Sequence, residues 1–147
     1  MQSINFNKGY KEYAVNGDES CVIRFVPSDF GILERMKKSV PVIEGIHQKY
    51  ADSKDDLDNL DDIMSTCDKE IREQINYIFG NDVCTAAFGT TNCLSPVGGN
   101  LLYLTFLDAV FPIVEKDISA EQAKVEKNIK KYTSQVKKND WCFAEQS

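Results

Sequence analysis

Two stripes of apolar residues with helical spacing occupy the middle of the chain. The first follows Pro27-Ser28-Asp29, where a Ser or Asp side chain can accept hydrogen bonds from the free amides that begin a helix. Its members recur every three or four residues: Phe30, Leu33, Met36, Val40, Ile43, His47 and Tyr50. The second stripe ends at a natural helix stop, Gly80, and comprises Leu57, Leu60, Met64, Cys67, Ile71, Ile75 and Ile78. The short polar link between the stripes predicts an antiparallel helical hairpin.

The first 27 residues have the pattern of β-structure. Tyr13 and Val15 alternate with polar residues, and residues 21–26 form a run rich in β-branched side chains. Asn16-Gly17 lies between these runs, and both residues accept the positive φ of a tight turn. We therefore expect a β-hairpin here, with a third strand around Ile4 as an extension of it. Because an isolated hairpin is marginal in water, it must pack on the helices or on a neighbour.

The segment 101–114 is apolar on nearly every face, which predicts burial in the core or in an oligomer interface. A loop is expected over 90–100, and a short helix before it within 81–88. Ser119 with Gln122 three residues later has the pattern of a capping box, so a new helix is expected to start there. Its apolar stripe is narrow: Val125, Ile129, Tyr132 and Val136. The end of the chain is predicted to be loosely held, although Trp141 and Phe143 can dock.

These elements predict an α+β chain that is mostly α, with an N-terminal β-hairpin followed by a helical hairpin and two further helices. At 147 residues we expect one domain, residues 1–140, with the hairpin in 1–27 and a loosely held tail at 141–147. A chain of this length can bury roughly 68–70 % of its unfolded surface. Pro41 lies inside the first stripe and predicts that its helix is kinked or divided, since proline removes one helical hydrogen bond.

The charge is distributed unevenly. Residues 1–118 hold 11 basic and 19 acidic residues, a net charge of −8, whereas residues 119–147 hold 6 and 4, a net charge of +2. An acidic body argues against nucleic acid as the main partner. This separation of charge along the chain suits contact with another protein or with a second copy of the chain. The alternative is that the charged faces are solvated and bind no partner. No apolar run is long enough for a membrane span or a signal peptide, so a cytoplasmic protein is expected.

The sequence contains no recognisable catalytic, cofactor or metal motif. The acidic run between Asp52 and Asp62 lacks the glycine that a calcium-binding EF-hand loop requires. His47 is the only histidine, and the five cysteines form no CxxC pair. Gly98-Gly99-Asn100 lacks the lysine of a phosphate-binding loop. We therefore expect no catalytic residue, no cofactor and no metal, and a protein that is not an enzyme.

Five phrases between residues 4 and 117 match one group of proteins in overall pattern: INFNKGYKEYAVNGDES, VIRFVPSD, REQINYIFG, AFGTTNCLSP and LTFLDAVFPIVEKD. They resemble small phage and prophage proteins of Gram-positive bacteria that look like tail assembly chaperones. The resemblance implies a non-enzymatic protein that binds the helical tape measure protein, or another tail protein, in the host cytoplasm, and that commonly acts as a multimer.

The resemblance supplies no functional residue that transfers directly, so candidate partner-binding residues come from two other features. Phe88, Phe106 and Phe111 are apolar positions within the matching phrases, and Lys130 and Lys131 belong to the basic last helix. The alternative function is a phage- or prophage-encoded inhibitor of a host defence system, an anti-CRISPR-like acidic protein that binds a nuclease complex.

Overall fold

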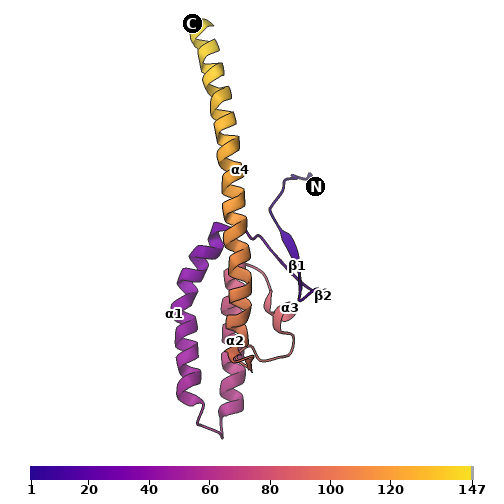
Figure 1. Ribbon diagram of the computed structural model, residues 1–147, viewed down its shortest axis with the longest axis vertical. Helices are drawn as coiled ribbons and strands as arrows, with labels where there is room; N and C mark the ends of the chain where they lie inside the picture. Colours follow the sequence, from indigo (N-terminus) through magenta and orange to yellow (C-terminus); the bar gives the residue numbers. More distant parts are fainter. Residues whose placement is uncertain (147) are drawn as a thin grey trace.

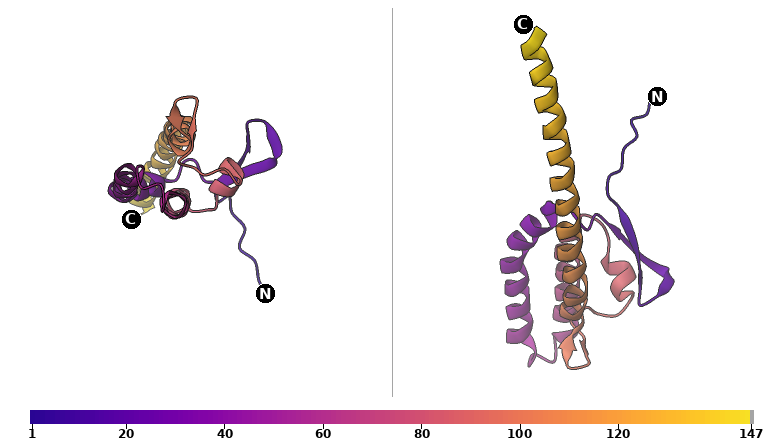
Figure 2. Two further views of the ribbon diagram at one scale, coloured as in Figure 1. Left: turned by 90° about the horizontal axis from the view of Figure 1, so that it is seen from below. Right: turned by 45° about the horizontal axis from the view of Figure 1, so that its top comes forward.

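The computed structural model describes the backbone of residues 1–146 and the side chains of residues 1–135. The elements in order are β1 (Lys11–Val15), β2 (Asp18–Phe25), α1 (Phe30–Ser53), α2 (Leu60–Phe79), α3 (Cys84–Phe88), β3 (Pro96–Val97), β4 (Asn100–Leu101) and α4 (Leu102–Gln146). The predicted fold class is confirmed: an antiparallel N-terminal hairpin precedes a mostly helical chain. Helices α1, α2 and α4 stand alongside one another, and the β1–β2 hairpin and α3 lie on the side of α2 away from α1 (Figures 1 and 2).

The β1–β2 hairpin forms where the sequence predicts it. Asn16 and Gly17 have φ angles of 52° and 77°, which makes a two-residue turn of the type that suits the twist of paired strands. Phe25 is buried, with its ring centroid 5.2 Å from that of Phe79 in an edge-to-face arrangement, so the hairpin packs against the end of α2. Residues 1–10 form no strand, and Ile4 is exposed. The expected third strand is therefore wrong, because nothing in that segment pairs with β1.

The helical hairpin of α1 and α2 is also confirmed. Asp29 Oδ1 accepts a hydrogen bond from the Gly31 amide over 2.8 Å and caps α1, and Gly80 ends α2 with a φ of 72°. The second predicted stripe is buried from Cys67 onward. Pro41 does not divide α1, which continues to Ser53 with a bend in its axis (Figure 1).

The first predicted stripe does not match the buried face of α1. The buried positions are Ile32, Ser39 and Ile46, whereas Leu33 and Val40 are exposed. The apolar residues of α1 cover more than one face, and sequence spacing alone cannot tell which face meets α2.

Helix α4 is one continuous helix of 45 residues, about 68 Å long at 1.5 Å per residue. The new helix start expected at Ser119 is therefore wrong. Pro112 lies on the exposed side and removes only one helical hydrogen bond, and Gly99 is the last glycine of the chain, so no strong breaker follows. The predicted docking of Trp141 and Phe143 concerns side chains outside the described residues.

The first part of α4 packs on the body and the rest projects from it (Figure 1). Tyr103, Leu107, Val110 and Val114 form the buried face. An ion pair joins Asp117 to Lys11 of β1, at the level where the helix leaves the body. Every residue from 122 to 135 is exposed. None of the helices within the described range is long and apolar enough to cross a membrane.

A second, small hairpin precedes α4 where a loop was expected. Pro96 pairs with Leu101 and Val97 with Asn100, and the turn residues Gly98 and Gly99 have φ angles of 61° and 83°. Two adjacent glycines that both adopt positive φ are the sequence signal for this turn.

Candidate functional site

An apolar groove with a volume of about 640 Å³ runs between α1 and α4. Its floor is formed by the buried side chains of Ile78, Tyr103 and Leu107. The more exposed walls come from both helices and comprise Met36, Val40 and Ile43 on α1 and Leu104 and Phe111 on α4. We call this feature the α1–α4 groove.

The groove exists because α1 carries apolar side chains on two adjacent faces. One face, centred on Ile32 and Ile46, packs into the core with α2. The other face contains four members of the stripe predicted from sequence: Met36, Val40, Ile43 and His47. Of these side chains Val40 is exposed, whereas the other three are half-buried at the edge of the core. The predicted stripe therefore identified a wall of the groove rather than the centre of the core.

The rim of the groove is polar and acidic. Glu44, Gln48 and Asp108 line it, and neither Glu44 nor Asp108 forms an ion pair with another described side chain. His47 also lines it, with its ring 6.1 Å from that of Tyr50, and its Nδ1 atom is buried without a hydrogen-bond partner among the described residues. An apolar floor with a negatively charged rim suits an apolar ligand that carries positive charge at its edges.

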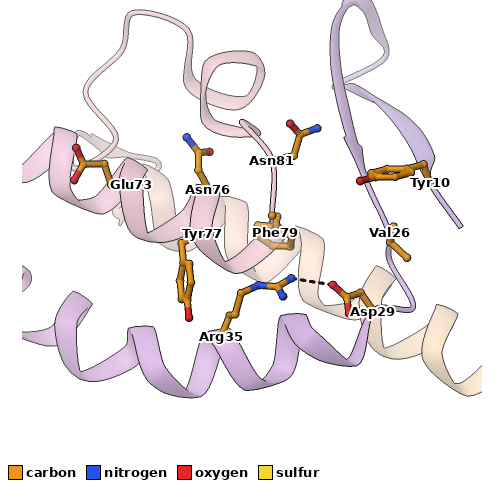
Figure 3. Close-up of a pocket in the computed structure, with 10 residues that line it drawn as sticks. Tyr10, Val26, Asp29, Arg35, Glu73, Asn76, Tyr77, Phe79 and Asn81 are labelled. Carbon is orange, nitrogen blue, oxygen red and sulfur yellow. Dashed lines mark hydrogen bonds and ion pairs between the residues drawn. The ribbon is translucent and has the colours of Figure 1, made fainter. Parts of the chain in front are cut away.

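A second hollow, of about 610 Å³, lies where α1, α2 and the N-terminal hairpin meet (Figure 3). Arg35 bonds there to Asp29 over 2.9 Å and donates from Nε to the carbonyl oxygen of Ile78 over 3.0 Å. Burial alone would raise the pKa of Asp29, but the hydrogen bonds from Arg35 and Gly31 outweigh it and hold the pKa below its ordinary value. These groups therefore tie α1 to the end of α2.

The side chains of two asparagines in the same hollow form hydrogen bonds with backbone groups. Asn76 Oδ1 accepts from the amides of Val83 and Cys84, and Asn81 donates to the carbonyl oxygen of Arg24 over 2.6 Å. The polar groups of this hollow thus hold the chain segments together, and we assign it a structural role.

The buried cysteines are poor candidates for nucleophiles. Burial raises the pKa of Cys84 to about 12, and it raises that of Cys93 even further. Their Sγ atoms donate to the backbone carbonyl oxygens of Arg72 and Asp68, at 3.6 and 3.7 Å. A thiol that is buried and protonated is inert, because the thiolate is the reactive form.

Within the described residues, no group of three or more His, Cys, Asp and Glu side chains is placed to hold a metal ion. The acidic run leads from the end of α1 into α2. Asp52 accepts a hydrogen bond from Gln48 and Asp56 accepts one from Asn59, and all four residues are exposed. These carboxylates form local hydrogen bonds near the turn between α1 and α2, and they face solvent.

The five candidate residues from the sequence occupy three separate places. Phe88 is buried with its ring 5.4 Å from Phe106, and Phe106 in turn lies 6.3 Å from Phe79. Both rings thus join α4 to α2 and α3. Phe111 lines the α1–α4 groove.

Lys130 and Lys131 are exposed on the projecting half of α4. They lie about 29–30 Å from Phe111 along the helix axis, at 1.5 Å per residue. The structure therefore does not bring the lysines and the phenylalanines of one chain together.

Sequence reasoning missed Glu44, Leu104 and Asp108 as groove residues. The sequence feature that could have indicated a groove is the width of the apolar surface on α1.

Comparison with protein-family models, with curated proteins and with solved structures finds no match to this chain. The groove is consequently the main structural guide to function.

Proposed function

We propose that this protein is a non-enzymatic binding protein whose α1–α4 groove receives an amphipathic helix of a partner protein. The observation that carries this proposal is the combination of an apolar floor and an acidic rim between two long helices. Such grooves bind the apolar face of a helix, with anchors at positions three and four residues apart. Basic residues beside those anchors would complement Glu44 and Asp108.

The resemblance to tail assembly chaperones identifies the partner that we propose. A tape measure protein is long, helical and prone to aggregate before the tail tube surrounds it. A chaperone needs an apolar surface that covers such a helix reversibly, and it needs no catalytic group. The inert thiols and the structural role of the second hollow agree with a binding function.

The experiment is co-expression with the tape measure protein of the same gene cluster, followed by measurement of its solubility and of co-purification. We expect the wild-type chain to increase the soluble fraction and to co-purify. Val40→Glu places a charge on the groove wall and should abolish both effects. Its matched control is Val42→Glu, which alters the same helix at a position outside the groove; the two valines are 39 % and 45 % exposed.

Equal solubility of the tape measure protein with and without the chain, and no co-purification, would contradict the chaperone function. Equal loss of binding in both valine variants would contradict the groove as the binding site. Circular dichroism of each purified variant establishes that it is folded.

A further inference from the structure

The apolar face of α4 continues beyond the body. The buried positions of the helix recur every three or four residues up to Val114, and Ile118 follows at the same spacing, partly buried. After an interruption at Glu121 and Gln122, the face continues with Val125, Ile129 and Tyr132, which are 51 %, 57 % and 69 % exposed. We call these three residues the projecting stripe. A narrow stripe of this spacing on a solvent-exposed helix is typical of a seam for another helix.

The projecting stripe matches in spacing three of the residues that α4 contributes to the floor and wall of the groove. Leu104, Leu107 and Phe111 are separated by steps of three and four residues, and the projecting stripe has steps of four and three. If two α4 helices cross antiparallel at Ile118, Val125 faces Phe111, Ile129 faces Leu107 and Tyr132 faces Leu104 of the other copy. One antiparallel register thus aligns all three pairs.

The charges on the two surfaces are complementary. Glu44 and Asp108 stand at the rim of the groove, and the projecting half of α4 carries Lys130 and Lys131. The same complementarity holds for the whole chain, because residues 1–118 carry a net charge of −8 and residues 119–147 one of +2. An antiparallel arrangement brings the basic half of each copy against the acidic body of the other.

We propose that the free protein forms an antiparallel dimer in which the projecting half of each α4 occupies the α1–α4 groove of the other copy. The same surface is used twice about a two-fold axis near Ile118, as in most homodimers. The dimer buries two apolar surfaces that the single chain leaves in water, the groove walls and the projecting stripe. A second copy fits better than the chain's own C-terminal half, because a fold-back requires a break near Ser119, where α4 is continuous.

The first test is the oligomeric state of the full chain by sedimentation velocity over a wide concentration range. We expect a dimer, and we expect Ile129→Glu to weaken dimerisation by at least about tenfold, because each dimer loses two buried isoleucines. Ala123→Glu is the matched control, since it adds the same charge on the opposite face of the projecting helix and should leave the dimer intact. A wild-type monomer at every concentration would overturn the proposal.

The second test fixes the arrangement by cysteine crosslinking under mild oxidation. Leu104→Cys and Tyr132→Cys, prepared separately and mixed, should give a crosslinked dimer, whereas neither variant alone should. Ile129→Cys should not crosslink to itself, because the two copies of this residue lie about 33 Å apart along an antiparallel pair at 1.5 Å per residue. Self-crosslinking of Ile129→Cys would indicate parallel helices, and a crosslink within one chain of the doubly substituted variant would indicate a fold-back. Either result overturns the proposal.

This inference concerns the free protein and does not depend on the proposed function, although both use the same groove. The dimer proposal and the chaperone proposal can be tested separately, because they predict different effects for the same variants. Ile129→Glu should weaken the dimer while the groove still binds the tape measure protein, and Val40→Glu should impair both. If Ile129→Glu leaves the dimer intact, the dimer proposal fails and the chaperone proposal is unaffected.

Discussion

Arg72 and Asp68 form a salt bridge one turn apart on α2, with Arg72 Nε donating to Asp68 Oδ1 over 3.0 Å. Arg72 also donates to the carbonyl oxygens of Gly89 and Thr91, and Asp68 accepts from the Cys93 amide over 2.8 Å. This pair therefore fastens the segment after α3 onto α2. That segment leads into α4, so the pair helps to position the α4 wall of the groove.

Arg72→Ala should lower the free energy of unfolding by about 2–4 kcal/mol, because it removes a partly buried charge pair and leaves two carbonyl oxygens without their donor. Lys38→Ala is the control, since it removes an exposed pair with Glu34 and should cost less than about 1 kcal/mol. Urea unfolding of the two variants measures the difference. Similar losses would show that the segment after α3 does not depend on Arg72.

The stability of the protein should fall in acid, in part through Asp68. Burial alone would raise the pKa of this carboxyl, but the hydrogen bonds from the Cys93 amide and Arg72 outweigh it, so the folded-state pKa lies below its ordinary value. The pKa of an aspartate in the unfolded chain is about 3.9. At pH values above this, a carboxyl whose pKa is lowered in the folded state stabilises the fold, and this stabilisation is lost as the pH falls through the folded-state pKa.

Asp68→Asn should therefore be less stable than the wild type at neutral pH, and the gap should narrow below about pH 4. Urea unfolding at a series of pH values from neutral to strongly acidic measures both effects. A gap that stays constant over this series would contradict the assignment to Asp68.

The local elements of the fold follow from the sequence because they depend on local chemistry. Asn16-Gly17 determines the first turn, Asp29 caps α1 and Gly80 ends α2. The break expected at Ser119 does not occur, because the residues of a capping box also fit within a helix when no proline or glycine lies beside them. Whether Val40 faces the core or a groove depends on where α4 lies, and this is decided by the contacts of Phe79 with Phe106 and Phe111.

The buried thiols should resist alkylation in the folded protein. With a pKa of about 12, only on the order of one Cys84 in ten thousand is a thiolate at pH 8, and the side chain is also buried. Iodoacetamide followed by peptide mass spectrometry should therefore label the partly exposed Cys21 before Cys84 and Cys93. Cys84 and Cys93 should react only after urea is added. Rapid labelling of Cys84 in the folded protein would instead identify a reactive nucleophile.

Reversal of charge at Lys130 and Lys131 should affect association and not folding. Both side chains are exposed on the projecting half of α4, so the double change to Glu should leave the melting temperature nearly unchanged. It should slow association of two copies of the chain, since it removes the attraction between the basic half of α4 and the acidic body, and exposed charges mainly set the on-rate. Surface plasmon resonance measures this rate, and added salt should reduce the difference from wild type. The same double change at Lys37 and Lys38 of α1 is the control.

Substitutions of Phe106 and Phe111 should have different effects, the first on folding and the second on partner binding, although the two residues lie only five positions apart on α4. Phe106 packs edge-to-face against both Phe79 and Phe88, so Phe106→Ala should lower the free energy of unfolding by roughly 3–5 kcal/mol. Phe111 contacts Phe79 at one side and lines the groove at the other, so Phe111→Ala should cost less stability and weaken partner binding by about 2 kcal/mol.

Thermal melting together with titration of the partner at a temperature where both variants are folded tests this separation. Because a binding anchor contributes only when the partner is present, Phe111→Ala should lose affinity out of proportion to its loss of stability. If Phe106→Ala instead loses affinity at unchanged stability, the partner contacts the aromatic cluster of α2, α3 and α4, and the groove is not the binding site.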